Sequence, residues 1–424
     1  MENKNEGKHP ELLRALTLKD AVGVGLGAII GAGIFVVTGV AAGVAGPAFL
    51  VALLFAGLIA ACNGLSSAQL AAVYPSSGGT YEYGYRLLNP WYGFSAGWMF
   101  LVSKLTAAGV VAIGFGSYFY QLVPVLSPLA LSVLAVVLLT VANYFGIKKA
   151  GALNLAIVSV TILSLLYLVF SSFPAVKMEN MVPFAPFGIT GIAEASALLF
   201  FAFTGYARIA TLAEEVSEPE KTIPRAVIIT IISAIILYAA VSYIAVGVVG
   251  AELMAGSKSP LQVVADALTT PAISTVITIG ASTAMLGVLL SQILGISRML
   301  LAMGRRHDLP PFFERVHKEH RVPHLGIFVT GAIILVLTIV GSFEFIVRAA
   351  SFTILLYYSI TNIAALKQPA SEQIYGKLVP VLGLIGCLAM SVSLPLEVIA
   401  SGIGLLLTGY VFRKAFRKVY GSVK

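Results

Sequence analysis

Two short segments of the 424-residue chain could bind a small solute through their backbone atoms. Gly31-Ala32-Gly33 lies near the middle of a long apolar stretch that is rich in glycine. Glycine in a helix interior costs about 1 kcal/mol relative to alanine. Phe200–Tyr206, with the sequence FFAFTGY, lies near the middle of another apolar stretch. We predict that a helix is interrupted at each place.

Each interruption would expose backbone N–H and C=O groups, which must line a cavity or be buried in protein because lipid cannot satisfy them. The N–H groups after the first break carry the positive end of a helix dipole and suit a carboxylate. The carbonyls before the breaks suit an ammonium group or a cation. Two facing breaks therefore match a zwitterion such as an amino acid. The alternative for the first segment is close helix packing, which Gly27 and Gly31 also fit.

Two basic side chains lie where apolar residues are the rule. Lys104 falls near the middle of an apolar stretch, where a charged residue is a functional candidate by default. We interpret it as a proton-coupling group or an indirect contact to the solute site; the alternative is a structural lysine bonded to helix-end carbonyls. Arg208 follows the second break and cannot discard its charge. It either pairs with Glu214 and Glu215 or shifts the preference of the site toward acidic solutes.

The elements that must position these groups are membrane-spanning helices. Apolar residues make up 58 % of the chain and charged residues 11 %, against about 45–50 % and 25 % in soluble domains. So few charges cannot cover the outside of a soluble protein, and the apolar residues must face lipid. A spanning helix needs about 20 residues. We predict twelve spans, at 18–44, 47–73, 92–121, 127–145, 151–173, 191–216, 222–249, 272–303, 324–341, 345–366, 377–393 and 396–412.

Lysine and arginine lie mainly on the segments that face the cytoplasm if the N-terminus is inside. Of the 27 such residues, only three fall on the outer side: Lys177, Lys258 and Arg348. This asymmetry predicts a multi-pass protein of the cytoplasmic membrane with both termini in the cytoplasm. It also explains the net charge of +8 without a nucleic-acid partner. We predict no removable signal peptide.

Other chemistry is not indicated. Cys62 and Cys387 lie inside apolar stretches, so we expect no disulfide. Four histidines lie within 307–324, but no cysteine or carboxylate pattern completes a metal site, and we predict neither a metal nor an organic cofactor. No nucleophile–base pair or P-loop points to an enzyme or an ATP-driven pump. A channel would need a repeated polar face that no span shows. We predict a short amphipathic helix over Pro310–Arg321.

The two breaks lie five helices apart, which gives the two halves opposite topology, as in transporters built from inverted repeats. Four motifs, in order, resemble those of the amino acid–polyamine–organocation (APC) transporters: Gly25–Phe35, Tyr74–Tyr81, Phe200–Tyr206 with the following loop through Pro224-Arg225-Ala226, and Ser297–Pro310. The last two spans match only in hydropathy.

The resemblance implies an all-α, LeuT-like membrane protein of twelve transmembrane helices, arranged as a 5+5 inverted repeat plus two C-terminal helices. The corresponding regions are a cytoplasmic segment (1–17), the first five-helix repeat (18–173), the second repeat (191–366), two additional helices (377–412) and a basic cytoplasmic tail (413–424). It further implies a secondary transporter that moves an amino acid or a related small solute by alternating access, as a monomer or weak homo-oligomer. An amine or carboxylate exchanger and a non-transporting amino-acid sensor of this fold stay as alternatives.

The resemblance also implies roles for individual residues. Backbone N–H groups around Ala32, Gly33 and Ile34 would hold the carboxylate, and carbonyls of both breaks would hold the amino group. Phe201 matches the aromatic residue that closes over the substrate in relatives. The full predicted set is Ile29, Ile30, Ala32, Gly33, Ile34, Phe201, Ala202, Phe203, Thr204 and Gly205.

This chain departs from the family pattern in its fifth span. Several relatives carry a lysine there whose ammonium replaces a sodium ion, and the matching position is Thr161. Its hydroxyl could help to bind sodium, but the facing stretch Ala284–Gly287 has no side-chain oxygen. The candidates for coupling are therefore Lys104, Thr161 and Arg208, with H⁺ favoured over Na⁺ as the coupling ion.

Overall fold

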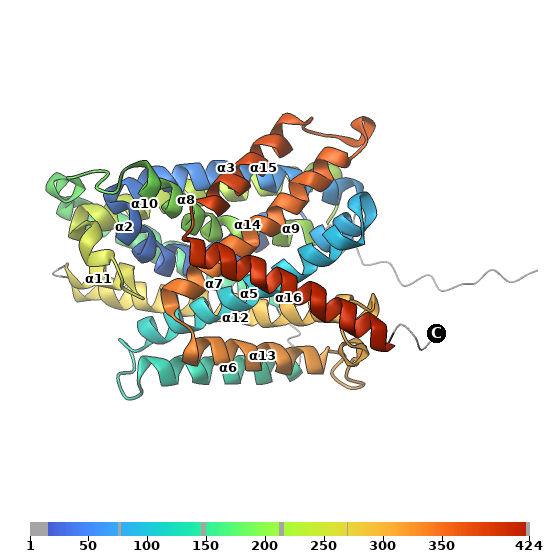
Figure 1. The fold of residues 1–424 in the computed structure, drawn as a ribbon. Coiled ribbons are helices and arrows are strands. Elements are labelled where there is room, and N and C mark those ends of the chain that lie inside the picture. Colours follow the sequence, from blue (N-terminus) through green and yellow to red (C-terminus); the bar gives the residue numbers. More distant parts are fainter. Residues whose placement is uncertain (1–15, 75–77, 146–149, 212–215, 269, 421–424) are drawn as a thin grey trace, which may run out of the picture.

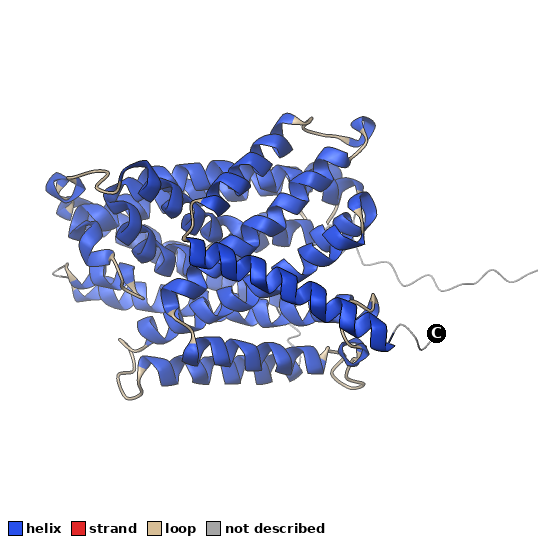
Figure 2. Cartoon of the chain, in the orientation of Figure 1, coloured by secondary structure: helices blue, strands red, loops and turns tan. Residues whose placement is uncertain are grey.

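A computed structural model describes residues 16–74, 78–145, 150–211, 216–268 and 270–420. Within these ranges every regular element is a helix (Figure 2), apart from one isolated bridge between Leu16 and Val216. Each of the twelve predicted spans overlaps a helix. The predicted all-α class is confirmed.

The first half of the chain contains α1 (Leu18–Ile29), the π-helical segment η1 (Gly33–Val37), α2 (Thr38–Ala45), the 3₁₀ turn η2 (Gly46–Ala48), α3 (Phe49–Val73), α4 (Thr80–Tyr83), the π-helical segment η3 (Gly84–Leu88), α5 (Pro90–Phe119), α6 (Pro128–Phe145) and α7 (Ala150–Ser172). Two 3₁₀ turns, η4 (Phe173–Ala175) and η5 (Met178–Met181), lead into the second half.

The second half contains α8 (Gly188–Phe203), the 3₁₀ turn η6 (Thr204–Tyr206), α9 (Ala207–Thr211), α10 (Pro219–Met254), α11 (Pro260–Asp266), α12 (Pro271–Arg305), the 3₁₀ turn η7 (Pro311–Glu314), α13 (His324–Val340), α14 (Phe343–Lys367), the 3₁₀ turn η8 (Ala370–Glu372), α15 (Leu378–Val392) and α16 (Leu396–Tyr420). The helix α11, between two spans, was not predicted.

Local sequence explains where the helices that carry the site begin. Thr17 and Asp20 form a capping box at the start of α1, with reciprocal side-chain and backbone hydrogen bonds. Asn89 caps α5 by accepting from the N–H groups of Trp91 and Tyr92, and Pro90 occupies the first helical position, where its missing N–H costs nothing.

The prediction of an amphipathic helix over Pro310–Arg321 is wrong. Only the 3₁₀ turn η7 forms there, and Arg315 returns to an extended conformation. Pro310 is extended (φ −51°, ψ 141°), because the residue before a proline is kept out of the α-helical region, so a helix cannot start before Pro311. Phe313 is buried against the chain's own apolar residues and does not face a membrane.

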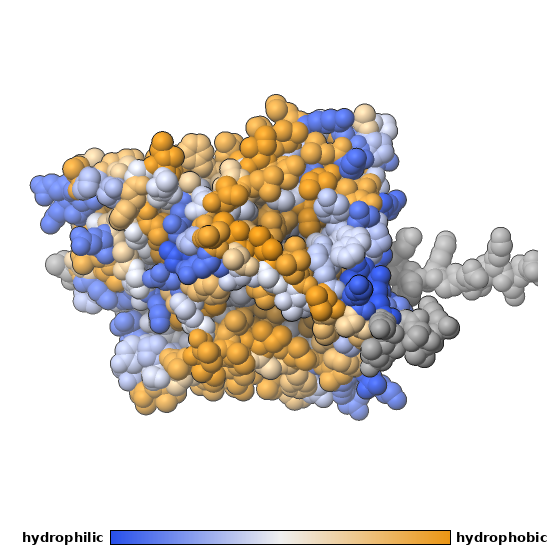
Figure 3. Space-filling view, in the orientation of Figure 1, coloured by the Kyte–Doolittle hydropathy of each residue, from blue (hydrophilic) through white to orange (hydrophobic). Residues whose placement is uncertain are grey.

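The helices have the length and composition of membrane spans. Nine described helical stretches are long and apolar enough to cross a bilayer, and one of them, Leu18–Val73, contains the first two predicted spans. His324–Val340 and Leu378–Val392 are shorter apolar helices. Figure 3 shows hydrophobic residues over the middle of one face and hydrophilic residues gathered at its left and right ends. This distribution is that of a protein embedded in lipid.

The spans divide into central and peripheral helices. Helices α5 and α14 are mostly buried and pack against each other, and α5 also packs along α12. Helices α6 and α13 lie side by side at the lower edge of Figure 1, and α16 runs across the front against α14 and α5. Because α5 is central, the charged residue in its middle is enclosed by protein.

Candidate functional site

The first break lies where the glycine pattern predicts it. Helix α1 ends at Ile29, Ile30 is extended (φ −78°, ψ 102°), and a new helical segment starts at Gly33. The first N–H groups of a helix have no partner within it. The backbone at Ala32 and Gly33 therefore offers hydrogen-bond donors in the middle of the protein, as required for binding a carboxylate.

The second break is milder than the sequence suggests. A single 3₁₀ turn, η6, joins α8 to α9, and the backbone stays in the right-handed helical region on both sides. The hydroxyl of Thr204 donates to the carbonyl oxygen of Phe201 at 3.0 Å. This bond satisfies one of the carbonyl groups that the turn frees.

The two breaks pack directly against each other. A Cβ atom on Gly33 would lie 2.5 Å from Cα of Ala202, and a Cβ atom on Gly205 would overlap the carbonyl group of Ala28. Each break thus places a glycine against the backbone of the other. Gly27 instead allows α1 to approach Asn154 on α7. The packing interpretation therefore applies to Gly27 and also to Gly33, and the binding interpretation stays a prediction.

Tyrosine hydroxyls hold three of the carbonyl groups near the breaks, which sequence reasoning missed. Tyr238 on α10 donates to Ile29 O at 2.8 Å and lies 3.4 Å from Ala202 O. Tyr358 on α14 donates to Thr204 O at 3.2 Å. Tyr118 on α5 donates to Phe35 O at 2.6 Å. The available signal was a tyrosine inside an apolar span, whose hydroxyl needs a partner when buried. That signal does not name the partner.

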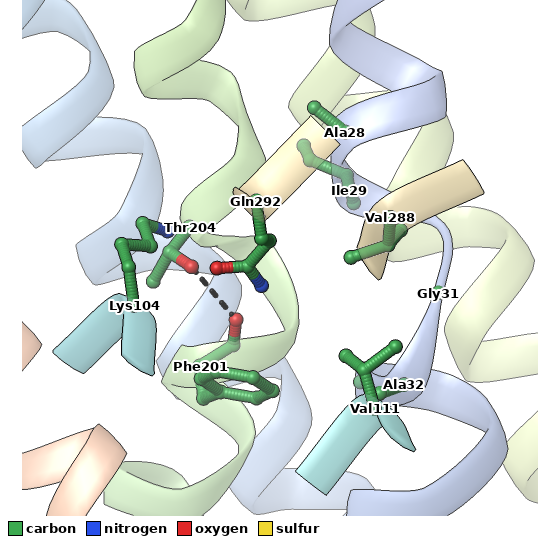
Figure 4. Close-up of a pocket in the computed structure, with 11 residues that line it drawn as sticks. Ala28, Ile29, Gly31, Ala32, Lys104, Val111, Phe201, Thr204, Val288 and Gln292 are labelled. Carbon is green, nitrogen blue, oxygen red and sulfur yellow. Dashed lines mark hydrogen bonds between the residues drawn. The ribbon is translucent and has the colours of Figure 1, made fainter. Parts of the chain in front are cut away.

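Beside the breaks lies a small cavity of about 40 Å³, which has room for only a few water molecules. Its wall contains residues of both breaks and of α5 and α12 (Figure 4), namely Ala28, Ile29, Gly31, Ala32, Gly33, Lys104, Val111, Phe201, Thr204, Val288 and Gln292.

Half of the predicted solute-binding residues line this cavity: Ile29, Ala32, Gly33, Phe201 and Thr204. The remaining predicted residues pack behind the wall: Ile30, Ile34, Ala202, Phe203 and Gly205. Phe203, for example, has its ring 5.4 Å from that of Tyr238. The position of a helix break in the sequence does not reveal which of its residues face the cavity.

Lys104 lines the cavity directly, whereas the sequence suggested a proton-coupling group, an indirect contact to the solute site or a structural lysine. Its side chain and that of Gln292 reach into the space from α5 and α12, with Thr204 between them in Figure 4. Within the described residues Lys104 makes no hydrogen bond or ion pair, and its Nζ lies 5.8 Å from the ring centre of Phe100. The amide oxygen of Gln292 is buried without a hydrogen-bond partner there.

Arg208 lies on α9, directly after the second break. Its guanidinium donates to the hydroxyl of Ser291 at 2.7 Å. Arg208 is close enough to act electrostatically on Lys104, and Arg298 acts in the same way on Arg208. The predicted partners Glu214 and Glu215 lie outside the described residues. Three positive groups thus follow one another from the cavity along α12.

Thr161 lies away from the cavity. It is buried on α7 and donates to the carbonyl oxygen of Ile157 in its own helix, at 2.8 Å. Gly287 of the facing helix packs against Ile157. The structure brings Lys104 and Arg208 together with the breaks but leaves Thr161 in a helix contact.

A second polar cluster, also missed from the sequence, surrounds Asp308. Its carboxylate is fully buried and accepts from Arg413 at 2.8 Å, Arg417 at 3.0 Å, Tyr81 at 2.8 Å and Tyr85. Burial, and then the hydrogen bond to Asp308, raise the pKa of Tyr85 well above its usual value, so it is a neutral donor. The cluster joins α4 and η3, the end of α12, and α16.

Comparisons with known proteins agree with this geometry. A family model described as amino acid permease matches residues 20–413. An uncharacterized transporter of Mycobacterium tuberculosis is 39 % identical over 401 residues, covering 94 % of this chain and 90 % of its own. The branched-chain amino acid permease BcaP of Bacillus subtilis is 29 % identical over 428 residues, covering 94 % and 92 %.

A solved structure shows the same fold. The crystal structure of MhsT in complex with L-phenylalanine superposes with a TM-score of 0.64 at 17 % identity, over 91 % of this chain and 99 % of MhsT. MhsT is a transporter of the LeuT fold. The protein is a multi-pass membrane protein with that fold, and it belongs to the amino acid permease family of the APC superfamily.

Proposed function

We propose that the protein is a secondary transporter that moves an amino acid or a related small solute across the cytoplasmic membrane by alternating access. One observation carries the proposal: the two helix breaks pack against each other beside a small cavity, and Ala32 and Gly33, where a helical segment begins, lie on its wall. Helix N-termini suit a carboxylate. The family match and the relative that is a branched-chain amino acid permease support the same class of solute.

The proposal includes twelve crossings, two inverted five-helix repeats and cytoplasmic termini. The cavity is too small for an amino acid as it stands, so entry of the solute requires the walls to move apart. Because the breaks are the places where α1 and α8–α9 can bend, we assign this movement to them.

Coupling is proposed to use protons and not sodium. Lys104 is the ionisable side chain in the cavity wall, whereas Thr161 does not line the cavity and donates its hydroxyl hydrogen within its own helix. The side chains of the facing stretch Ala284–Gly287 contain no oxygen that could complete a sodium site.

The test is a thermal-shift screen of the purified protein against amino acids, followed by uptake of each ligand into proteoliposomes with imposed proton or sodium gradients. A ligand of the native state raises the unfolding temperature by mass action. We expect at least one α-amino acid to bind and to be taken up faster with a proton gradient. Gly33→Val should abolish binding, because its side chain would collide with the backbone of Ala202, and circular dichroism should check that the variant is still helical. If no α-amino acid raises the unfolding temperature, the proposal is overturned.

A further inference from the structure

We propose that the cavity takes a solute with a second carboxylate, of which an acidic amino acid is the simplest example, and that Lys104 pairs with this distal carboxylate. The inference rests on the proposed function and adds the class of substrate. It follows from the balance of donors, acceptors and charges on the cavity wall.

The wall has open hydrogen-bond donors. The N–H groups of Ala32 and Gly33 begin a helix and have no partner within it. The ammonium of Lys104 can donate three hydrogen bonds and makes none within the described residues. Both sets of donors suit carboxylate oxygens, and they come from different helices. A solute with two carboxylates could engage both.

Three carbonyl acceptors at the breaks already have one side-chain donor each. The carbonyl of Ile29 accepts from Tyr238, that of Phe201 accepts from Thr204, and that of Thr204 accepts from Tyr358. These are the carbonyls that would hold the ammonium group of a neutral amino acid. The amide oxygen of Gln292 is the side-chain acceptor on the wall that lacks a partner. Each of these oxygens keeps a second lone pair and can still hold the single ammonium group of an amino acid, while the open donors of the wall could hold more than one carboxylate.

The charges favour an anion as well. None of the residues that line this described cavity is Asp or Glu. Lys104 is the charged residue among those that line the described cavity. An enclosed ammonium group without a counter-charge is costly in the middle of a membrane protein. A carboxylate brought by the solute offsets that cost, whereas a cationic side chain is repelled.

A competing role for Lys104 makes a different prediction. If the lysine served only to carry a coupling proton, the solute would need no second carboxylate, and neutral amino acids would bind at least as well as acidic ones. The selectivity of the unmodified protein distinguishes the two roles before any variant is made.

The experiment measures dissociation constants of the purified full-length protein for glutamate, aspartate, alanine, leucine and arginine by thermal shift. We expect glutamate or aspartate to bind at least 10-fold more tightly than alanine or leucine, and arginine not to bind. Lys104→Met should weaken binding of the acidic ligand at least 10-fold and change binding of alanine less than 3-fold. The matched control is Lys258→Met, an exposed lysine outside the cavity, which should change neither.

The outcomes separate this inference from the proposed function. Binding of alanine or leucine as tight as that of glutamate overturns the inference and leaves the amino-acid transporter in place. Succinate is included as a ligand with two carboxylates and no amino group. If succinate binds and no α-amino acid does, the proposed function is overturned and a two-carboxylate site is supported. If none of these ligands binds, both the inference and the proposed function are overturned. If Lys104→Met does not fold, the selectivity of the unmodified protein still decides.

Discussion

Tyr238 of α10 donates its hydroxyl hydrogen to the carbonyl oxygen of Ile29, the last residue of α1, across 2.8 Å. The bond is fully buried and links the end of the first broken helix to a continuous neighbour. It holds the carbonyl side of the break in place while the N–H side stays open. Several expected outcomes depend on this and on the other contacts around the breaks.

Tyr238→Phe should lower the unfolding temperature. The ring stays, but the buried carbonyl of Ile29 loses its donor, which costs about 1–3 kcal/mol. Tyr243→Phe on the same helix is the control, because its exposed hydroxyl contacts only a sulfur atom at 3.8 Å. Equal unfolding temperatures for the two variants would contradict the assigned role of Tyr238.

Gly205→Ala should weaken binding of the solute at least tenfold. Its new Cβ would collide with the backbone of Ala28, and so push the two breaks apart. Binding is measured by thermal shift on the purified variant. Gly23→Ala serves as the control, since its Cβ would meet only one atom, at 4.0 Å from Leu155. Normal affinity in Gly205→Ala would show that the breaks need not touch.

Asp308→Asn should destabilise the protein by about 3–5 kcal/mol, because it leaves the buried guanidinium of Arg413 without a counter-charge. Glu218→Gln is the control: its pair with Lys221 is exposed and is worth about 0–1 kcal/mol. Thermal unfolding of both variants provides the comparison. An Asp308→Asn protein as stable as the control would mean that α16 does not depend on this cluster.

Cysteine labelling should place the two ends of α12 on opposite sides of the membrane. Lys258 and Lys318 are exposed on either side of this helix, and Cys62 and Cys387 are both buried. An impermeant thiol reagent added to intact cells should label Lys258→Cys but not Lys318→Cys, which should react only after the cells are opened. The reverse pattern would invert the proposed topology.

Thr161→Val should leave uptake within about threefold of the unmodified protein, with or without sodium. Its side chain does not line the cavity, and its hydroxyl donates within its own helix, so its loss removes no ion ligand under our proposal. Uptake into proteoliposomes in sodium and in choline buffers provides the measurement. A sodium-stimulated uptake that Thr161→Val abolishes would restore sodium as the coupling ion.

Hydrophobic runs and their spacing were enough to predict the helices. Each predicted span overlaps a helix because about twenty consecutive apolar residues have no other stable form in lipid. The first break could also be predicted, because the two glycines of Gly31-Ala32-Gly33 weaken the helix at one place. The wrong prediction over Pro310–Arg321 came from reading amphipathic spacing without the effect of two adjacent prolines.

The site needed the tertiary structure. Lys104, Thr204 and Gln292 are far apart in the chain and meet in one cavity only because α5 and α12 pack beside the breaks. Sequence spacing reports which residues share a face of one helix, but not which face another helix covers. For the same reason Tyr238 and Asp308 could be seen as polar residues that need partners, yet the partners themselves could not be named.

The apolar pattern by itself determined a helical membrane protein with a break in its first helix. Only the packing of those helices decided which charged and polar groups line the cavity, because that choice depends on contacts between residues that are distant in sequence.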